Sequence, residues 1–141
     1  MSYTTTVKVR FGDIDHAGIA YYPNLYHYFH IAFEEFFEEF VGTPYPEVLD
    51  RDRIGFPTVR VETEFLKPIR YGDTLVISIT IPRIGRSSVE LVFTATRRGD
   101  DSACILSRQT VVCVDMATLR PAELPQRYRE LFERCSPRLA P

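Results

Sequence analysis

Apolar and polar side chains alternate at the start of the chain and again along later segments. Tyr3, Val7, Val9 and Phe11 share one face, and this period of two predicts a strand over residues 3–11. The same pattern predicts strands at 59–65, 75–81 and 89–95, and a last run at 103–115 is partly apolar on both faces. Turn sequences separate the later strands: Tyr71-Gly72-Asp73, Ile84-Gly85-Arg86 and Gly99-Asp100-Asp101.

Between the first two strands the period changes to that of a helix, over residues 23–40. Pro23 suits the first helical position, and Gly42 is the expected C-cap. The apolar side chains occupy one wide, aromatic arc: Leu25, Tyr26, Phe29, Ala32, Phe33, Phe36, Phe37 and Phe40. Such an arc indicates a helix that lies in a concave surface. Shorter helices are expected at 46–53 and 126–135.

The order strand, long helix, four strands, short helix predicts an α+β fold. We expect an antiparallel sheet of about five strands, with the long helix packed on one face. One helix cannot cover both faces of such a sheet, so the other face is solvated or meets a second subunit. The last strand offers few polar positions to water, which favours the second subunit.

Composition narrows the class of protein. With 141 residues, 45% of them hydrophobic, the chain fits one folded domain over residues 1–141. The net charge is -2, so the chain lacks the excess of basic residues that is typical of a nucleic-acid-binding protein. No apolar run approaches the ~18 residues of a membrane span, and the first residues do not resemble a secretory signal. The three cysteines have neither disulfide nor zinc spacing, so we expect reduced thiols in a cytoplasmic protein.

A specific motif precedes the long helix: Phe11-Gly12-Asp13-Ile14-Asp15-His16-Ala17-Gly18-Ile19-Ala20-Tyr21-Tyr22-Pro23-Asn24. Through it, and through weaker similarity at 54–57, 65–73, 86–88 and 107–115, the chain resembles hotdog-fold acyl-CoA thioesterases of the 4-hydroxybenzoyl-CoA thioesterase type. The resemblance implies a curved antiparallel sheet wrapped around one central helix. It also implies a homo-oligomer, dimer or tetramer, with active sites at subunit boundaries. The family uses no cofactor and no metal.

The resemblance assigns catalytic roles within the motif. Asp15 corresponds to the catalytic carboxylate, acting as nucleophile or general base; without the resemblance, a turn-capping role would be the favoured explanation. Backbone N–H groups at the start of a helix can stabilise an oxyanion, and Tyr22 is the natural last donor because Pro23 has no N–H. Gly18 would allow close approach of the substrate. His16 is expected to assist catalysis or orient the substrate.

Substrate contacts are expected elsewhere in the chain. Arg86 and Ser87 align with a basic-serine stretch that the family uses for the nucleotide part of CoA. Thr58 is expected to line the acyl pocket. The aromatic residues near these positions (Tyr21, Tyr22, Tyr26 and Phe56) favour an aromatic or short-to-medium acyl group.

Three other interpretations compete with hydrolysis of an acyl-CoA to free acid and CoA. Asp15-His16 imitates the Asp-His pair of hotdog-fold hydratases and dehydratases that act on 2-enoyl thioesters. A non-catalytic module that binds acyl-CoA would have the same fold. Asp13, Asp15 and His16 together could suggest a metal site, but their adjacent spacing gives no convergent geometry, and we expect none.

Overall fold

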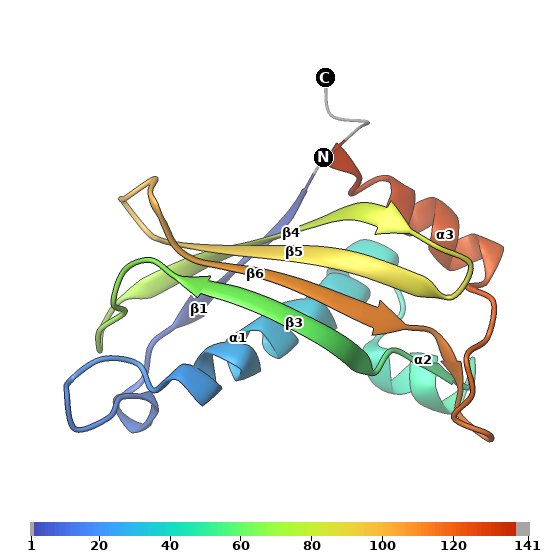
Figure 1. Ribbon diagram of the computed structural model, residues 1–141, viewed down its shortest axis with the longest axis horizontal. Coiled ribbons are helices and arrows are strands. Elements are labelled where there is room, and N and C mark those ends of the chain that lie inside the picture. The colour runs from blue at the N-terminus through green and yellow to red at the C-terminus, as the bar shows by residue number, and fades with distance from the viewer. Residues whose placement is uncertain (1, 138–141) are drawn as a thin grey trace.

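In the computed structural model, which describes residues 2–137, five strands form one antiparallel sheet (Figure 1). Their spatial order is β1-β4-β5-β6-β3, so β1 and β3 are the edges. The strands are β1 (Tyr3–Lys8), β3 (Thr58–Phe65), β4 (Thr74–Ile84), β5 (Ser88–Arg97) and β6 (Ala103–Val112). The predicted α+β class with an antiparallel five-stranded sheet is confirmed.

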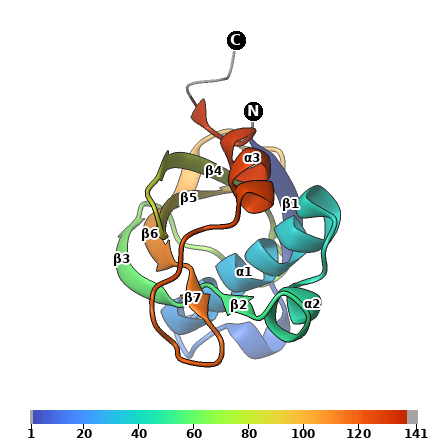
Figure 2. The ribbon, with the colours of Figure 1, turned by 90° about the vertical axis from the view of Figure 1, so that its right-hand side faces the viewer.

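The long helix α1 (Tyr22–Glu35) begins one residue earlier than predicted and continues into a π-helical segment, η2 (Phe36–Val41). Gly42 ends it with a left-handed backbone, φ +84°, and its N–H donates to the Phe37 carbonyl at 2.9 Å. This is the predicted glycine cap. Figure 2 shows α1 on the concave side of the curved sheet, as the wide apolar arc predicts.

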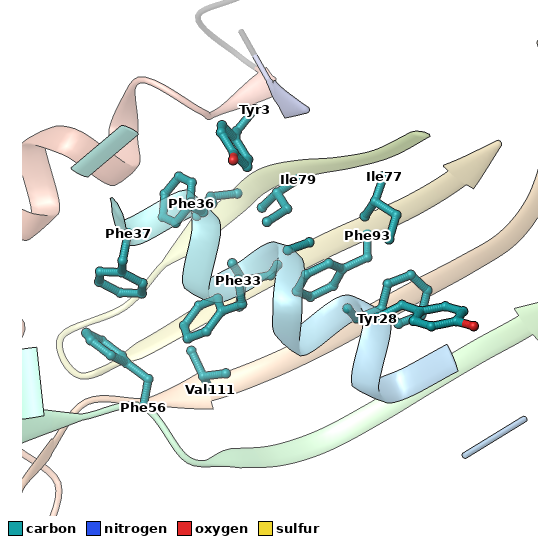
Figure 3. Close-up of a cluster of buried hydrophobic side chains, with 14 of the residues drawn as sticks. Tyr3, Tyr28, Phe33, Phe36, Phe37, Phe56, Ile77, Ile79, Phe93 and Val111 are labelled. Atoms are coloured by element: carbon teal, nitrogen blue, oxygen red, sulfur yellow. The ribbon is translucent and has the colours of Figure 1, made fainter. Parts of the chain in front are cut away.

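Aromatic side chains of α1 and η2 form the centre of the core (Figure 3). Phe29 meets Phe93 of β5 with ring centroids 5.1 Å apart, and Phe33 and Phe37 pack against Phe56. Burying one such ring contributes about 1.5–3 kcal/mol, so this helix–sheet contact is a main source of stability. Tyr28 is also buried, although it lies outside the predicted arc.

Two predicted strands are shorter than expected. The first ends at Lys8 because the chain turns at Phe11 into the 3-10 helix η1 (Phe11–Asp13), which leaves Phe11 exposed. The last divides at Cys113, whose N–H still donates to the Ser87 carbonyl at 2.7 Å in register with β5, but whose carbonyl accepts the Ala122 N–H at 2.8 Å. A two-residue strand β7 (Val114–Asp115) then pairs with β2 (Ile54–Gly55).

Two short helices complete the fold, α2 (Tyr45–Asp50) and α3 (Gln126–Glu133), close to the predicted ranges. The sheet face turned away from α1 carries polar and charged side chains, including an Arg108–Glu90 ion pair with a 2.6 Å N–O distance. A second subunit against that face therefore stays a prediction. Within residues 2–137, no helix has the length and apolar character needed to cross a bilayer.

Candidate active site

The motif before α1 folds as a small hairpin. Ile14 and Ala20 face each other across it, and the Asp15 N–H donates to the Ile19 carbonyl at 2.9 Å. The Ala20 N–H donates to the Ile69 carbonyl at 2.6 Å, which joins the hairpin to the β3–β4 connection. The hairpin therefore holds Asp15 at a fixed place beside the start of α1.

Asp13 fastens this hairpin to the helix. Its carboxylate accepts a hydrogen bond from the Tyr28 hydroxyl at 2.5 Å and another from the Arg10 N–H at 3.0 Å. Its carbonyl accepts one from the Asn24 side chain at 2.9 Å. Figure 3 shows the Tyr28 hydroxyl pointing out of the core. Burial, together with the hydrogen bond to Asp13, raises the pKa of Tyr28 above its usual value.

This positioning role of Asp13 was missed by sequence reasoning, which weighed the residue only as a metal ligand. The available signal is Tyr28, a large aromatic residue just outside the predicted apolar arc of the helix. A buried tyrosine needs a partner for its hydroxyl, and an aspartate in the preceding loop is a suitable acceptor. Within the described residues, no group of three His, Cys, Asp or Glu side chains converges as a metal site would require.

Asp15 is half-buried and has a free oxygen. Its Oδ1 accepts the Ala17 N–H at 2.8 Å, and its carbonyl accepts the Gly18 N–H at 3.0 Å. The turn-capping role considered for Asp15 is therefore present. No hydrogen bond or ion pair from residues 2–137 reaches Oδ2, so the carboxylate can still act on a substrate or a water molecule.

Gly18 and His16 occupy the tip of the hairpin. Gly18 has φ +81°, a left-handed backbone that favours glycine, and the space where a Cβ would stand is open. The turn alone explains this glycine, and a contact with substrate stays a prediction. His16 is exposed, so its imidazole is accessible from solvent.

The hairpin leads directly into α1 at Tyr22, with Pro23 as the second helical residue. Among residues 2–137, no acceptor is bonded to the Tyr22 N–H, as expected at the first turn of a helix. The positive end of the helix dipole lies here, which favours negative charge on a bound group. The Tyr22 side chain is 59% exposed and its ring lies 5.5 Å from that of Tyr21.

Two cavities flank the first turns of α1. One of about 260 Å³ lies between α1 and the concave sheet face, and its lining includes Thr58, Tyr26, His30 and Gln109. The other, of about 300 Å³, lies at the helix start and is bordered by Tyr22. Asp15 borders neither cavity; the opposite arm of its hairpin, through Ile19 and Ala20, borders the second.

Arg86 and Ser87 form the turn between β4 and β5, at the other end of the sheet from the hairpin. β4 alone has 11 residues, so about 33 Å separates its two ends. Arg86 is exposed, and the main-chain carbonyls of this turn bond to Leu124 and Cys113. One chain therefore does not bring Arg86 or Ser87 to Asp15.

Comparison with known proteins places this geometry in a family. The model of the thioesterase-like superfamily matches residues 9–132, which include the hairpin, the helix and every strand of the sheet except β1. The chain belongs to this superfamily. The predicted family, fold and enzyme class, a hotdog-fold thioesterase, are thereby confirmed.

Curated relatives and solved structures agree with this assignment. A 1,4-dihydroxy-2-naphthoyl-CoA hydrolase of Nostoc punctiforme is 31% identical over 133 residues, covering 94% of this chain and 88% of that protein. A gentisyl-coenzyme A thioesterase structure is 28% identical, with a TM-score of 0.81, covering 90% of this chain and 99% of that one. A Synechocystis 1,4-dihydroxy-2-naphthoyl-CoA thioesterase has the same fold, with a TM-score of 0.84 at 19% identity, covering 94% and 96%.

Proposed function

We propose that the protein is an acyl-CoA thioesterase that hydrolyses an aromatic acyl-CoA to the free acid and CoA. The observation that carries the proposal is the short segment that leads into α1. It holds the Asp15 carboxylate with a free oxygen and the unpaired Tyr22 N–H, and a cavity lies next to it. The relatives named for 1,4-dihydroxy-2-naphthoyl-CoA and gentisyl-CoA support an aromatic acyl group.

Asp15 is the catalytic group in this proposal. Either it attacks the thioester carbonyl carbon and forms an anhydride that water then opens, or it takes a proton from the water that attacks. In both routes the carbonyl oxygen gains negative charge, which the Tyr22 N–H stabilises, and the C–S bond breaks to release CoA. Gly18 leaves room for the thioester, and His16 orients it.

The acyl group is assigned to the cavity between α1 and the sheet. The first residue of α1 that lines this cavity is Tyr26, which lies one turn beyond Tyr22, about 6 Å along the helix axis. Phe29, Phe33 and Phe93 supply aromatic walls. An aromatic ring fits such a lining because ring–ring contacts add to the burial of apolar area. Thr58 lies at the cavity's rim on β3.

A second copy of the chain is assigned to the β3 edge. Every strand edge offers unpaired N–H and C=O groups, but the two edges of this sheet differ in side chains. β1 exposes Thr4, Thr6 and Lys8, whereas exposed apolar residues follow β3: Val59, Val61, Phe65 and Leu66. Antiparallel pairing of two β3 strands would cover these residues and form a symmetric dimer.

Such a dimer also accounts for the distance between Arg86 and Asp15. Antiparallel β3 strands bring the β4–β5 turn of one subunit to the sheet end where the other subunit has its hairpin. The turn and the partner's hairpin are then separated across the sheet by three strand spacings of ~4.8 Å, about 15 Å in all. An extended pantetheine arm can bridge this distance. Arg86 and Ser87 would thus bind the nucleotide part of CoA across the subunit boundary. A monodisperse monomer in light scattering would refute this arrangement.

The proposal also retains two broader predictions. Residues 1–141 are a single domain, and the enzyme is cytoplasmic. All three cysteines, Cys104, Cys113 and Cys135, are buried free thiols, which supports a reducing compartment.

Thiol release from a panel of acyl-CoAs tests the proposed function. Wild-type protein should hydrolyse at least one of benzoyl-CoA, 4-hydroxybenzoyl-CoA and 1,4-dihydroxy-2-naphthoyl-CoA. Asp15→Asn should lower kcat at least about a hundredfold, the usual loss for a catalytic acid or base, while acyl-CoA still binds. Because an Asn oxygen can still accept the Ala17 N–H, the variant should keep its melting temperature. Undiminished hydrolysis by Asp15→Asn would remove Asp15 from the mechanism.

The same panel separates the competing functions. With crotonyl-CoA, loss of the enoyl absorbance without free thiol would identify a hydratase. Binding of acyl-CoA without turnover of any substrate would identify a non-catalytic module. Both results differ from those expected for hydrolysis.

A further inference from the structure

Four polar side chains form a continuous hydrogen-bonded row at the wall of the α1–sheet cavity. The Tyr26 hydroxyl donates to the Thr63 Oγ1 at 3.0 Å. Thr63 and Ser107 share a hydroxyl–hydroxyl hydrogen bond of 2.9 Å, and the Gln109 Nε2 donates to the Ser107 Oγ at 3.2 Å. The row therefore joins α1, β3 and β6.

This row is unexpected on the concave face of the sheet. Ser107 is 0% exposed, and it lies beside two apolar residues, its register partner Phe93 on β5 and Ile105 on the same face of β6. A buried hydroxyl costs stability unless it is hydrogen-bonded, and an apolar residue in its place would avoid the requirement. Packing alone therefore does not explain why polar residues occupy these positions.

Counting donors and acceptors shows what the row leaves unused. The Tyr26 proton goes to Thr63, and one proton of the Gln109 amide goes to Ser107. No hydrogen bond from residues 2–137 reaches the Gln109 Oε1. Both Gln109 and Tyr26 line the cavity, so an amide oxygen and a phenolic oxygen remain there as acceptors.

We propose that Gln109 is a specificity-determining residue whose Oε1 accepts a hydrogen bond from a hydroxyl group on the aromatic acyl substrate. Ser107 fixes the amide by accepting its Nε2–H, so the oxygen is presented to the ligand. The Tyr26 oxygen is a second acceptor on the same wall. This inference rests on the proposed thioesterase function and names its substrate class as hydroxylated aromatic acyl-CoAs.

The placement of Gln109 supports this role. It faces Val61 of β3 and Leu91 of β5 in the sheet register, and all three line the cavity. An aromatic ring held beside Val61 and Leu91 is removed from water. A hydroxyl substituent on that ring would therefore lose its hydrogen bonds to water unless the cavity supplied a partner. A fixed acceptor at this point favours the hydroxylated ring over the plain one.

The experiment compares kcat/KM for benzoyl-CoA with that for its 2-, 3- and 4-hydroxy derivatives. Wild-type enzyme should prefer at least one hydroxylated substrate by about three- to tenfold, the contribution of one neutral hydrogen bond. Gln109→Leu should remove this preference, so that the ratio of kcat/KM for the hydroxylated substrate to that for benzoyl-CoA falls to about one. Ser107→Ala should reduce the preference in part, because Gln109 then loses the acceptor that orients it.

Two controls keep the test decisive. Gln126→Leu changes an exposed glutamine on α3, which bonds Glu130, and should alter no ratio. Gln109→Met, similar in volume and flexible, replaces Gln109→Leu if the latter has a lowered melting temperature. Equal hydrolysis of plain and hydroxylated substrates by wild-type enzyme, or an unchanged preference in both Gln109 variants, would refute the inference while the proposed function stands. Failure to release thiol from any substrate would refute the proposed function itself.

Discussion

Replacing Tyr28 with Phe should loosen the hairpin that carries Asp15. The change removes only the hydroxyl that donates to the Asp13 carboxylate at 2.5 Å and leaves the buried ring in place. A hydrogen bond to a charged group contributes about 1.5–3 kcal/mol. Asp13 is half-exposed and can recruit water, so the lower end, about 1.5 kcal/mol, applies. With an unfolding entropy of about 0.3 kcal/mol per kelvin for 141 residues, the melting temperature should fall by about 5 °C.

Thermal unfolding followed by circular dichroism measures the stability, and thiol release far below the melting temperature measures the activity. Tyr128→Phe is the matched control: Tyr128 is equally buried and its hydroxyl donates to Asp52, but it lies on α3, across the molecule from the hairpin (Figure 1). Both variants should lose comparable stability. We expect only Tyr28→Phe to lower kcat, because only its hydroxyl positions the loop of Asp15.

A double-mutant cycle with Asp13→Asn tests the physical cause. If the Tyr28–Asp13 contact carries the effect, the double variant should lose less stability than the sum of the two single losses. Additive losses would refute the coupling. Equal kcat in Tyr28→Phe and Tyr128→Phe would refute the claim that Tyr28 positions the catalytic loop.

Two further predictions concern charge. Hydrogen bonds from Ser102 lower the pKa of Asp100 to about 2 from its ordinary 3.8, so the Asp100 charge stabilises the fold above about pH 4 and that contribution is lost as the pH falls through 2. Asp100→Asn should therefore lower the melting temperature at pH 7 and match wild type near pH 2; a constant difference would contradict this. Arg86→Ala should raise KM for CoA thioesters about three- to tenfold and leave pantetheine thioesters unaffected, whereas Arg83→Ala should change neither. An equal rise for both thioester types would reject the nucleotide contact.

Most of the fold follows from periodicity in the sequence. The period-two segments became strands and the aromatic arc became a helix in a concave sheet, because burial of apolar side chains dominates the free energy of folding. The errors lie at element ends. The first strand ends where the chain turns into η1, and the last divides where the Cys113 carbonyl accepts the Ala122 N–H; the period of two indicates neither. The π-helical turn after Glu35 likewise has no signal in periodicity.

The candidate site was predictable only in part. The motif identified the hairpin and Asp15, but periodicity does not indicate which of the two aspartates is bonded to the helix. The Tyr28 hydroxyl donates to Asp13, whereas the Asp15 carboxylate accepts only the Ala17 N–H among residues 2–137. The separation of Arg86 from Asp15 was equally invisible, because it depends on the length and direction of β4.

Two tyrosines of α1 connect the helix to both halves of the candidate site. Tyr26 and Tyr28 are two residues apart, so their side chains leave the helix about 200° apart. One donates to Thr63 on the edge strand and the other to Asp13 in the hairpin. The position of α1 against the sheet therefore determines both the cavity that we assign to the acyl group and the location of Asp15. A change that shifts α1, such as a smaller residue in place of its buried Phe29, should alter substrate preference and turnover together.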